Sequence, residues 1–96
     1  MRILLLGSGG RENALAWKLS QSPRCESLFI APGNAGTSQF GTNLNFSVTD
    51  FESIKKACID NKIDMVVVGP EEPLVKGVTD FLISSSSLKN LDVIGP

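Results

Sequence analysis

The strongest constraint on the fold of this 96-residue chain is the alternation of short apolar runs with longer amphipathic segments. Ile3–Leu6 is an unbroken apolar run, and Ile63–Val68 is rich in β-branched residues. Runs of this kind are typical of strands that are covered on both faces, as in parallel sheets. Leu28–Ala31 and Leu91–Ile94 predict two further strands. Apolar and polar residues alternate over positions 44–48, which predicts one more strand that is half-exposed.

Three helices are expected between these strands. The first spans Arg11–Gln21 and ends before Pro23, because the residue preceding a proline disfavours the helical conformation. The second begins after Thr49-Asp50, where either residue can cap the helix, and the third spans Leu74–Ile83. The order β-α-β-β-α-β-α-β predicts an α/β fold with right-handed crossovers. We expect one domain over residues 1–96, an open parallel sheet of about five strands with helices on both faces.

Composition argues against several classes of function. With a net charge of −1 and a pI of about 5.2, the chain has no electrostatic footprint for nucleic acid or an anionic membrane, and we expect neither as a partner. It contains no histidine, which excludes histidine-based catalysis and metal sites. We expect Cys25, Cys58 and Trp17 to be packing residues of a cytoplasmic protein in a reducing compartment. No apolar run approaches the ~18 residues of a membrane span.

The candidate binding residues lie in loops that directly follow predicted strands, because ligands of open α/β sheets bind beyond the carboxyl ends of the strands. The first loop, Gly7–Arg11, leads from a strand into a helix. Its glycines let backbone N–H groups approach a ligand, and the N-terminus of the helix favours anions. A phosphate is therefore the natural ligand of this loop. The alternative is that the glycines only form a tight turn between strand and helix.

A dinucleotide is a poor fit to this loop. The G-x-G-x-x-G fingerprint requires a third small residue where this chain has Glu12. It also requires an acidic residue at the end of the second strand, to hold the ribose hydroxyls, and that place is occupied by Ala31-Pro32-Gly33. Both departures count against NAD as the ligand.

Two further loops that follow strands offer polar groups. Asn34 has both a donor and an acceptor for a ligand, or else it is a turn residue in the left-handed conformation. Glu71 follows Gly69-Pro70, so we expect it near the rim of the sheet, where its carboxylate could bind an amine or sugar hydroxyls. The alternative for Glu71 and Glu72 is a solvated turn, and for Glu72 we favour that interpretation.

Several segments together resemble the phosphoribosylamine–glycine ligase family, whose members are also called glycinamide ribonucleotide synthetases. Gly7–Ala14 is similar to the GSGGREHA opening of that family, and Asn13 stands where the family usually has histidine. Other similar segments follow in the same order and at similar spacing: Ala16–Leu19, Ser22-Pro23, Ala31–Thr37 and Val67–Leu74. The resemblance spans the whole chain.

This resemblance implies a Rossmann-like N-terminal substrate-binding domain of an ATP-grasp ligase of purine biosynthesis. Members of the family join glycine to 5-phosphoribosylamine. ATP phosphorylates the glycine carboxylate, and the amine attacks the acyl phosphate to give glycinamide ribonucleotide, ADP and phosphate. ATP and Mg²⁺ are implied to bind in ATP-grasp and C-terminal domains that follow residue 96. We therefore expect no catalytic residue, cofactor or metal in these 96 residues, and no activity of them alone.

The resemblance also suggests roles for the loop residues. We expect Gly9, Gly10 and Arg11 to face the phosphate of phosphoribosylamine. Near its ribose or amine we expect residues of the next two loops, namely Asn34, Gly36 and Glu71. The expected partners are this substrate and the chain's own ATP-grasp and C-terminal domains. The alternatives are a stand-alone phosphate- or nucleotide-binding module and a regulatory or interaction domain of the same shape, which the reading frame beyond residue 96 distinguishes.

Overall fold

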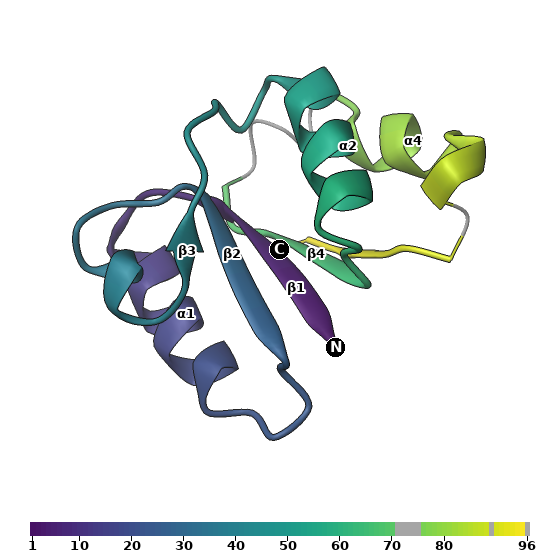
Figure 1. The fold of residues 1–96 in the computed structure, drawn as a ribbon. Coiled ribbons are helices and arrows are strands. Elements are labelled where there is room, and N and C mark those ends of the chain that lie inside the picture. Colours follow the sequence, from purple (N-terminus) through teal and green to yellow (C-terminus); the bar gives the residue numbers. More distant parts are fainter. Residues whose placement is uncertain (71–75, 89, 96) are drawn as a thin grey trace.

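The strands form one open parallel sheet in a computed structural model that describes residues 1–70, 76–88 and 90–95 (Figure 1). The strand order is β3-β2-β1-β4-β5, and every neighbouring pair is parallel. The predicted fold class is confirmed. The strands are β1 (Arg2–Gly7), β2 (Ser27–Pro32), β3 (Thr42–Asn43), β4 (Met65–Val68) and β5 (Asp92–Ile94). The helices are α1 (Gly10–Ser20), α2 (Phe51–Asp60) and α4 (Val78–Ile83), with the short 3-10 helices η1 (Thr37–Gln39) and η2 (Ser86–Leu88).

Strand β1 lies at the centre of the sheet, between β2 and β4. Its residues Leu4, Leu5 and Leu6 are fully buried. Leu4 and Leu6 belong to the apolar cluster under α2 and α4, whereas Leu5 belongs to the cluster under α1. A strand that is covered on both faces needs apolar residues at every position, which explains the unbroken apolar run in the sequence.

Helix α1 covers one face of the sheet, and α2 and α4 cover the other, as predicted (Figure 1). Ala16 of α1 is fully buried on the first face, and Ile54 of α2 and Leu82 of α4 are fully buried on the second. Helix α2 begins directly after Asp50, whose carboxylate accepts the backbone N–H of Ser53 at 3.2 Å and so caps the helix. None of the helices in the described part of the chain is long and apolar enough to cross a membrane.

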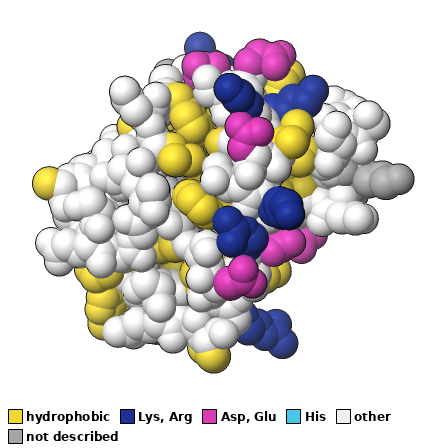
Figure 2. Space-filling model, in the orientation of Figure 1, with side chains coloured by type: hydrophobic (Ala, Val, Ile, Leu, Met, Phe, Trp, Pro, Cys, Tyr) yellow, Lys and Arg dark blue, Asp and Glu magenta, His cyan; other side chains and the backbone are white. Residues whose placement is uncertain are grey.

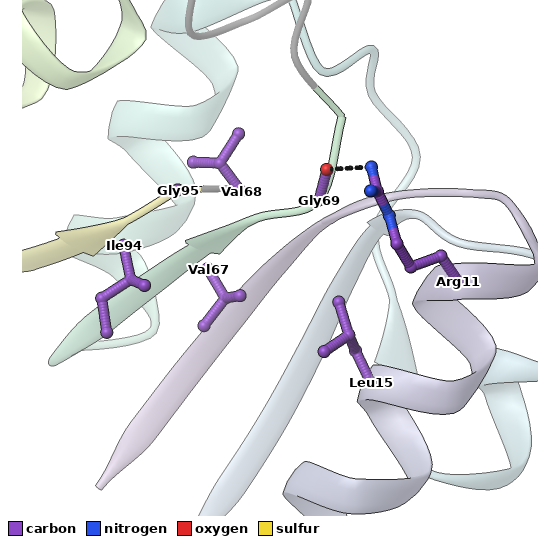
Figure 3. A pocket seen from close by; sticks show the side chains of 7 residues that line it. All are labelled: Arg11, Leu15, Val67, Val68, Gly69, Ile94 and Gly95. Carbon is purple, nitrogen blue, oxygen red and sulfur yellow. Dashed lines mark hydrogen bonds between the residues drawn. The ribbon is translucent and has the colours of Figure 1, made fainter.

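The face that carries α1 is covered over only half of its width. Helix α1 packs on β1 and β2. On the same face Val67 of β4 is half-buried, and its neighbour Ile94 of β5 is 48% exposed (Figure 3). Acidic and basic side chains are interspersed on the side of the molecule shown in Figure 2, so this side presents no patch of a single charge.

The strand predicted over residues 44–48 is wrong. Strand β3 has only two residues, and the chain leaves the sheet after Leu44 donates its N–H to the carbonyl of Ile30 at 2.7 Å. Leu44, Phe46 and Val48 are partly buried and pack against the apolar cluster under α2 and α4. Their alternation comes from a loop that places every second side chain against the core, and periodicity alone does not separate such a loop from a strand.

Two other expectations also differ from the structure. Helix α4 begins at Val78 instead of Leu74, because Gly77 forms a turn before it with a left-handed φ of 91°; Leu74 itself lies outside the described residues. Trp17 is 49% exposed and is therefore not a packing residue of the core. Cys58, in contrast, is only 1% exposed and packs in the core as expected.

Candidate functional site

The carboxyl ends of β1 and β4 lie side by side at the point where the path of the chain around the sheet reverses. From β1 the chain runs to α1 on one face, whereas α4, which follows β4, lies on the other face (Figure 1). The two connections therefore diverge here, and this switch point is where open α/β sheets bind their ligands. The Gly7–Gly10 turn lies on one side of the switch point, and Gly69 lies on the other.

The glycine turn, residues 7–10, joins β1 to α1 and leaves two backbone N–H groups available. Gly7 has a φ of 141°, a conformation that favours glycine. Gly9 is extended, and its carbonyl accepts the first hydrogen bonds of α1. Among the described residues, no acceptor takes the N–H of Gly10 or of Arg11. Free N–H groups at the N-terminus of an 11-residue helix are an arrangement that binds anions.

Glu12 fills the space beneath the two loops, although it is absent from the site residues that the sequence predicts. Only 6% of this residue is exposed. Its Oε1 accepts the N–H of Gly9 at 3.3 Å. A Cβ atom on Gly7 would overlap the carboxyl group, and one on Gly69 would lie 2.9 Å from the carboxyl carbon. The side chain of Glu12 therefore requires glycine at the ends of both β1 and β4. In the sequence, Glu12 is noticeable only as a departure from the dinucleotide fingerprint.

Arg11 connects the first loop to the third. Its Nη2 donates to the carbonyl of Gly69 at 2.5 Å (Figure 3). Its Nε lies 3.8 Å from Oε2 of Glu12. The side chain remains 63% exposed, and because a guanidinium has five N–H donors, several stay available to a ligand. Arg11 also lies at one end of a hollow of about 240 Å³. The rest of its lining is mainly apolar and consists of Leu15, Val67, Val68, Gly69, Ile94 and Gly95 (Figure 3).

Asn34 ties the second loop to the first. Its side-chain NH₂ donates to the carbonyl of Ser8 at 2.7 Å, and its Oδ1 accepts the N–H groups of Gly36 at 2.8 Å and Thr37 at 3.0 Å. The left-handed conformation falls on Gly33, with a φ of 72°, and not on Asn34. The alternative that Asn34 is a left-handed turn residue is therefore wrong. Its amide is a link between loops, with both its donor and its acceptor engaged.

Gly36 packs against Asn13, the residue at the position where the resembled family has histidine. A Cβ atom on Gly36 would lie 2.8 Å from Nδ2 of Asn13. The Oδ1 atom of Asn13 is buried and has no hydrogen-bond partner among the described residues. The second loop therefore touches α1 directly at this point, and a larger residue at position 36 would have to displace Asn13.

The loops that carry Gly9, Gly10, Arg11, Asn34 and Gly36 thus contact one another at a single edge of the sheet. Glu71 and Glu72 lie outside the described residues. The groups available to a ligand are N–H donors and one exposed guanidinium, a set that can bind and orient an anion. In the described ranges, no group of three or more His, Cys, Asp or Glu residues could hold a metal ion.

Comparisons with known proteins place the chain in a family. The family model described as "Phosphoribosylglycinamide synthetase, N domain" matches residues 1–96. A phosphoribosylamine–glycine ligase of Nostoc sp. is 47% identical over 98 residues, which cover 100% of this chain and 22% of that protein. The trifunctional purine biosynthetic protein adenosine-3 of Gallus gallus is 50% identical over 86 residues, which cover 88% of this chain and 9% of that protein.

A solved structure shares the fold. The crystal structure of phosphoribosylamine–glycine ligase from Thermotoga maritima matches with a TM-score of 0.64 and 31% sequence identity, covering 100% of this chain and 19% of that one. The chain spans about a fifth of the length of the ligases that it matches. The match over all 96 residues, together with the shared fold, shows that the chain belongs to the family of phosphoribosylglycinamide synthetase N domains.

Proposed function

We propose that this chain is the substrate-binding N-terminal domain of a phosphoribosylamine–glycine ligase. Relatives of similar sequence carry that name, and the chain corresponds to about a fifth of their length. In this proposal the whole protein uses ATP and Mg²⁺ to join glycine to 5-phosphoribosylamine, and other domains of the same polypeptide hold ATP and the metal. The residues described above bind and orient phosphoribosylamine and take no part in making or breaking bonds.

The observation that carries the proposal is the pair of N–H groups of Gly10 and Arg11 at the switch point, which have no acceptor among the described residues. Both point from the N-terminus of α1, whose dipole favours a negative charge. A phosphate monoester carries about −1.5 to −2 charges at neutral pH, so it gains from this dipole as well as from the hydrogen bonds. The exposed guanidinium of Arg11 adds a cation with free donors beside the same two groups.

The loops that carry Asn34 and Glu71 are proposed to contact the ribose or amine of the substrate and not its phosphate. Because the amide of Asn34 is engaged with the first and second loops, we assign it the role of holding the glycine turn beside Gly36. The ribose or amine of phosphoribosylamine then lies along the backbone of this loop. Glu71 is proposed to receive the amine or ribose hydroxyls from the third loop.

The proposal is tested by replacing Gly9 in the full-length ligase. Gly9→Val introduces a side chain whose Cβ would lie 3.8 Å from Oε1 of Glu12, an ordinary contact, so we expect the fold to be kept. The added methyl groups stand beside the free N–H groups and hinder the approach of a phosphate. The KM for phosphoribosylamine should rise by about tenfold or more, equivalent to roughly 1.4 kcal/mol, while the KM for ATP stays unchanged.

Ala14→Val is the matched control, because it places the same side chain on an exposed position of α1 one turn farther along. Ribose 5-phosphate and ribose serve as stable competitors that differ only in the phosphate. We expect ribose 5-phosphate to inhibit the wild type and the Ala14→Val variant, and to inhibit Gly9→Val much less. An unchanged KM for phosphoribosylamine in Gly9→Val, with unchanged inhibition by ribose 5-phosphate, refutes the phosphate site.

A further inference from the structure

Glu12 is the one charged residue that is buried in the described part of the chain, and the proposed binding residues do not include it. Burial of a carboxylate is unfavourable unless the charge is paired and hydrogen-bonded. Its partners are the N–H of Gly9 at 3.3 Å and the guanidinium of Arg11, whose Nε lies 3.8 Å from Oε2. Both partners belong to the segment that is proposed to bind phosphate, which suggests that the carboxylate acts through them.

The contact with Gly9 orients the glycine turn. The N-cap Gly9 and the first two residues of α1 carry three consecutive N–H groups, and Oε1 of Glu12 accepts that of Gly9. The N–H groups of Gly10 and Arg11 are left without an acceptor among the described residues. A turn whose first N–H group is fixed on the inner side has less freedom to rotate the next two away from the ligand, and preorganised donors bind an anion better than mobile ones.

The contact with Arg11 orients the guanidinium. Nη2 donates to the carbonyl of Gly69 (Figure 3). Nε lies 3.8 Å from the carboxylate of Glu12, so two groups of the protein contact the guanidinium. The two N–H groups of Nη1 have no acceptor among the described residues. The exposed 63% of the side chain therefore presents a cation in a defined orientation at the switch point.

We propose that Glu12 is a positioning residue for the phosphate of phosphoribosylamine: it fixes the glycine turn through Gly9 and the guanidinium through Arg11, without touching the substrate. This inference rests on the proposed function. The charge of Glu12 by itself would repel a phosphate. In this inference the residue nevertheless favours phosphate binding, because it orients the groups that contact the phosphate.

The test is a double-mutant cycle in the full-length ligase with Glu12→Gln, Arg11→Ala and the combined variant. Glu12→Gln keeps the shape and an acceptor for Gly9 but removes the charge that faces Arg11. We expect the single variant Glu12→Gln to raise the KM for phosphoribosylamine roughly tenfold, since a charge-assisted contact becomes a neutral one. The KM values for ATP and glycine should not change. In the Arg11→Ala background the same replacement should raise the KM less than about twofold, because the partner is gone.

Glu52→Gln in the first turn of α2 is the matched control for loss of an acidic residue near a helix N-terminus, and we expect no change in any KM. Arg11→Lys is a second variant that does not depend on the folding of Glu12→Gln. Lysine keeps the charge but cannot reach Gly69 and Glu12 with one rigid fork. We expect it to raise the KM for phosphoribosylamine as Glu12→Gln does.

The outcomes separate this inference from the proposed function. If Arg11→Ala leaves the KM for phosphoribosylamine unchanged, the guanidinium does not bind the phosphate, and the role of Glu12 through Arg11 is overturned. The site formed by the backbone N–H groups, which Arg11→Ala retains, is refuted only by the Gly9→Val test. If Arg11→Ala raises this KM but Glu12→Gln does not, only the positioning role is overturned. If Glu12→Gln raises this KM equally in both backgrounds, the part of that role that acts through Arg11 is overturned. An Arg11→Lys variant with the wild-type KM overturns it as well, because charge alone would then suffice.

Discussion

Replacement of Gly7 by alanine should destabilise this chain more than any other single methyl addition in the glycine turn. Gly7 has a φ of 141°, which a residue with a side chain rarely adopts, and a Cβ atom there would overlap the carboxyl group of Glu12. Gly10 differs on both counts, because its φ is not positive and nothing lies within 4 Å of a Cβ atom. The two glycines thus allow a comparison within one turn.

The expected loss has two parts. Holding a non-glycine residue in a sparsely populated backbone region costs about 1–3 kcal/mol. Displacing the carboxylate of Glu12 breaks its hydrogen bond to Gly9 and leaves a buried group unpaired, which costs about 1–3 kcal/mol more. Because the chain can relax partly, we expect a total near 3 kcal/mol for Gly7→Ala. For Gly10→Ala we expect between no change and a gain of about 0.4–1 kcal/mol from the restricted unfolded chain.

Urea denaturation of the 96-residue chain measures these differences. With a slope of about 1–1.5 kcal/mol per molar urea, the midpoint for Gly7→Ala should fall by roughly 2–3 M, and that for Gly10→Ala should stay or rise slightly. Glu12→Ala as a background isolates the overlap with the carboxyl group. If Gly7→Ala shifts the midpoint as much in that background as in the wild type, the overlap is not the cause. Equal midpoints for Gly7→Ala and Gly10→Ala would refute both parts of the reasoning.

Four further predictions concern residues elsewhere in the chain. Asp50→Ala should lower the free energy of unfolding by about 1 kcal/mol through loss of the cap on Ser53, whereas Asp50→Asn should nearly retain it; urea midpoints check both. Burial raises the pKa of the Cys58 thiol from 9.0 to about 12. The unfolded thiol therefore ionises first, so stability should be full below about pH 9 and fall as the pH rises from there toward 12, a dependence that Cys58→Ala should weaken. A thiol reagent should label the half-buried Cys25 before Cys58, as peptide mapping would reveal. Arg2→Lys should cost about 1 kcal/mol in thermal or urea unfolding, because lysine cannot contact both Asn61 and Ser27.

The sequence predicts best the elements in which burial requires an apolar residue at every position. Strand β1 is covered on both faces, so its apolar run stands out. Strand β4 has a similar run, but only Val66 and Val68 are buried, and Met65 and Val67 on the α1 face are half-buried. Residues 44–48 show the converse, because a loop that packs alternate side chains on the core has the period of a strand. The first residue of α4 is not predicted either. Gly77 in the left-handed conformation places the start of the helix at Val78, but it does not interrupt the apolar pattern of the sequence.

At the site, the positions of the loops follow from topology, whereas the contacts between them do not. The rule that ligands bind at strand ends identifies the glycine turn and the loops of Asn34 and Gly69. Which side chain links which loop depends on how neighbouring strands are registered, information that a single sequence does not contain. The sequence does not indicate a role for Glu12, because in the glycine fingerprint it counts only as a missing small residue. In the structure its side chain fills the space that Gly7 and Gly69 leave open.

The contact between Asn13 and Gly36 has a consequence for how the proposed site responds to acidity. An asparagine does not titrate, and the whole chain lacks histidine, the side chain whose ordinary pKa lies nearest neutrality. Between about pH 5 and pH 8 the loops around Gly36 should therefore hold a constant charge. Affinity for a sugar phosphate in that range should follow the second ionisation of the ligand's own phosphate, near pH 6. Asn13→His would place a titrating imidazole near the ligand's phosphate, so the affinity would then depend on two ionisations instead of one.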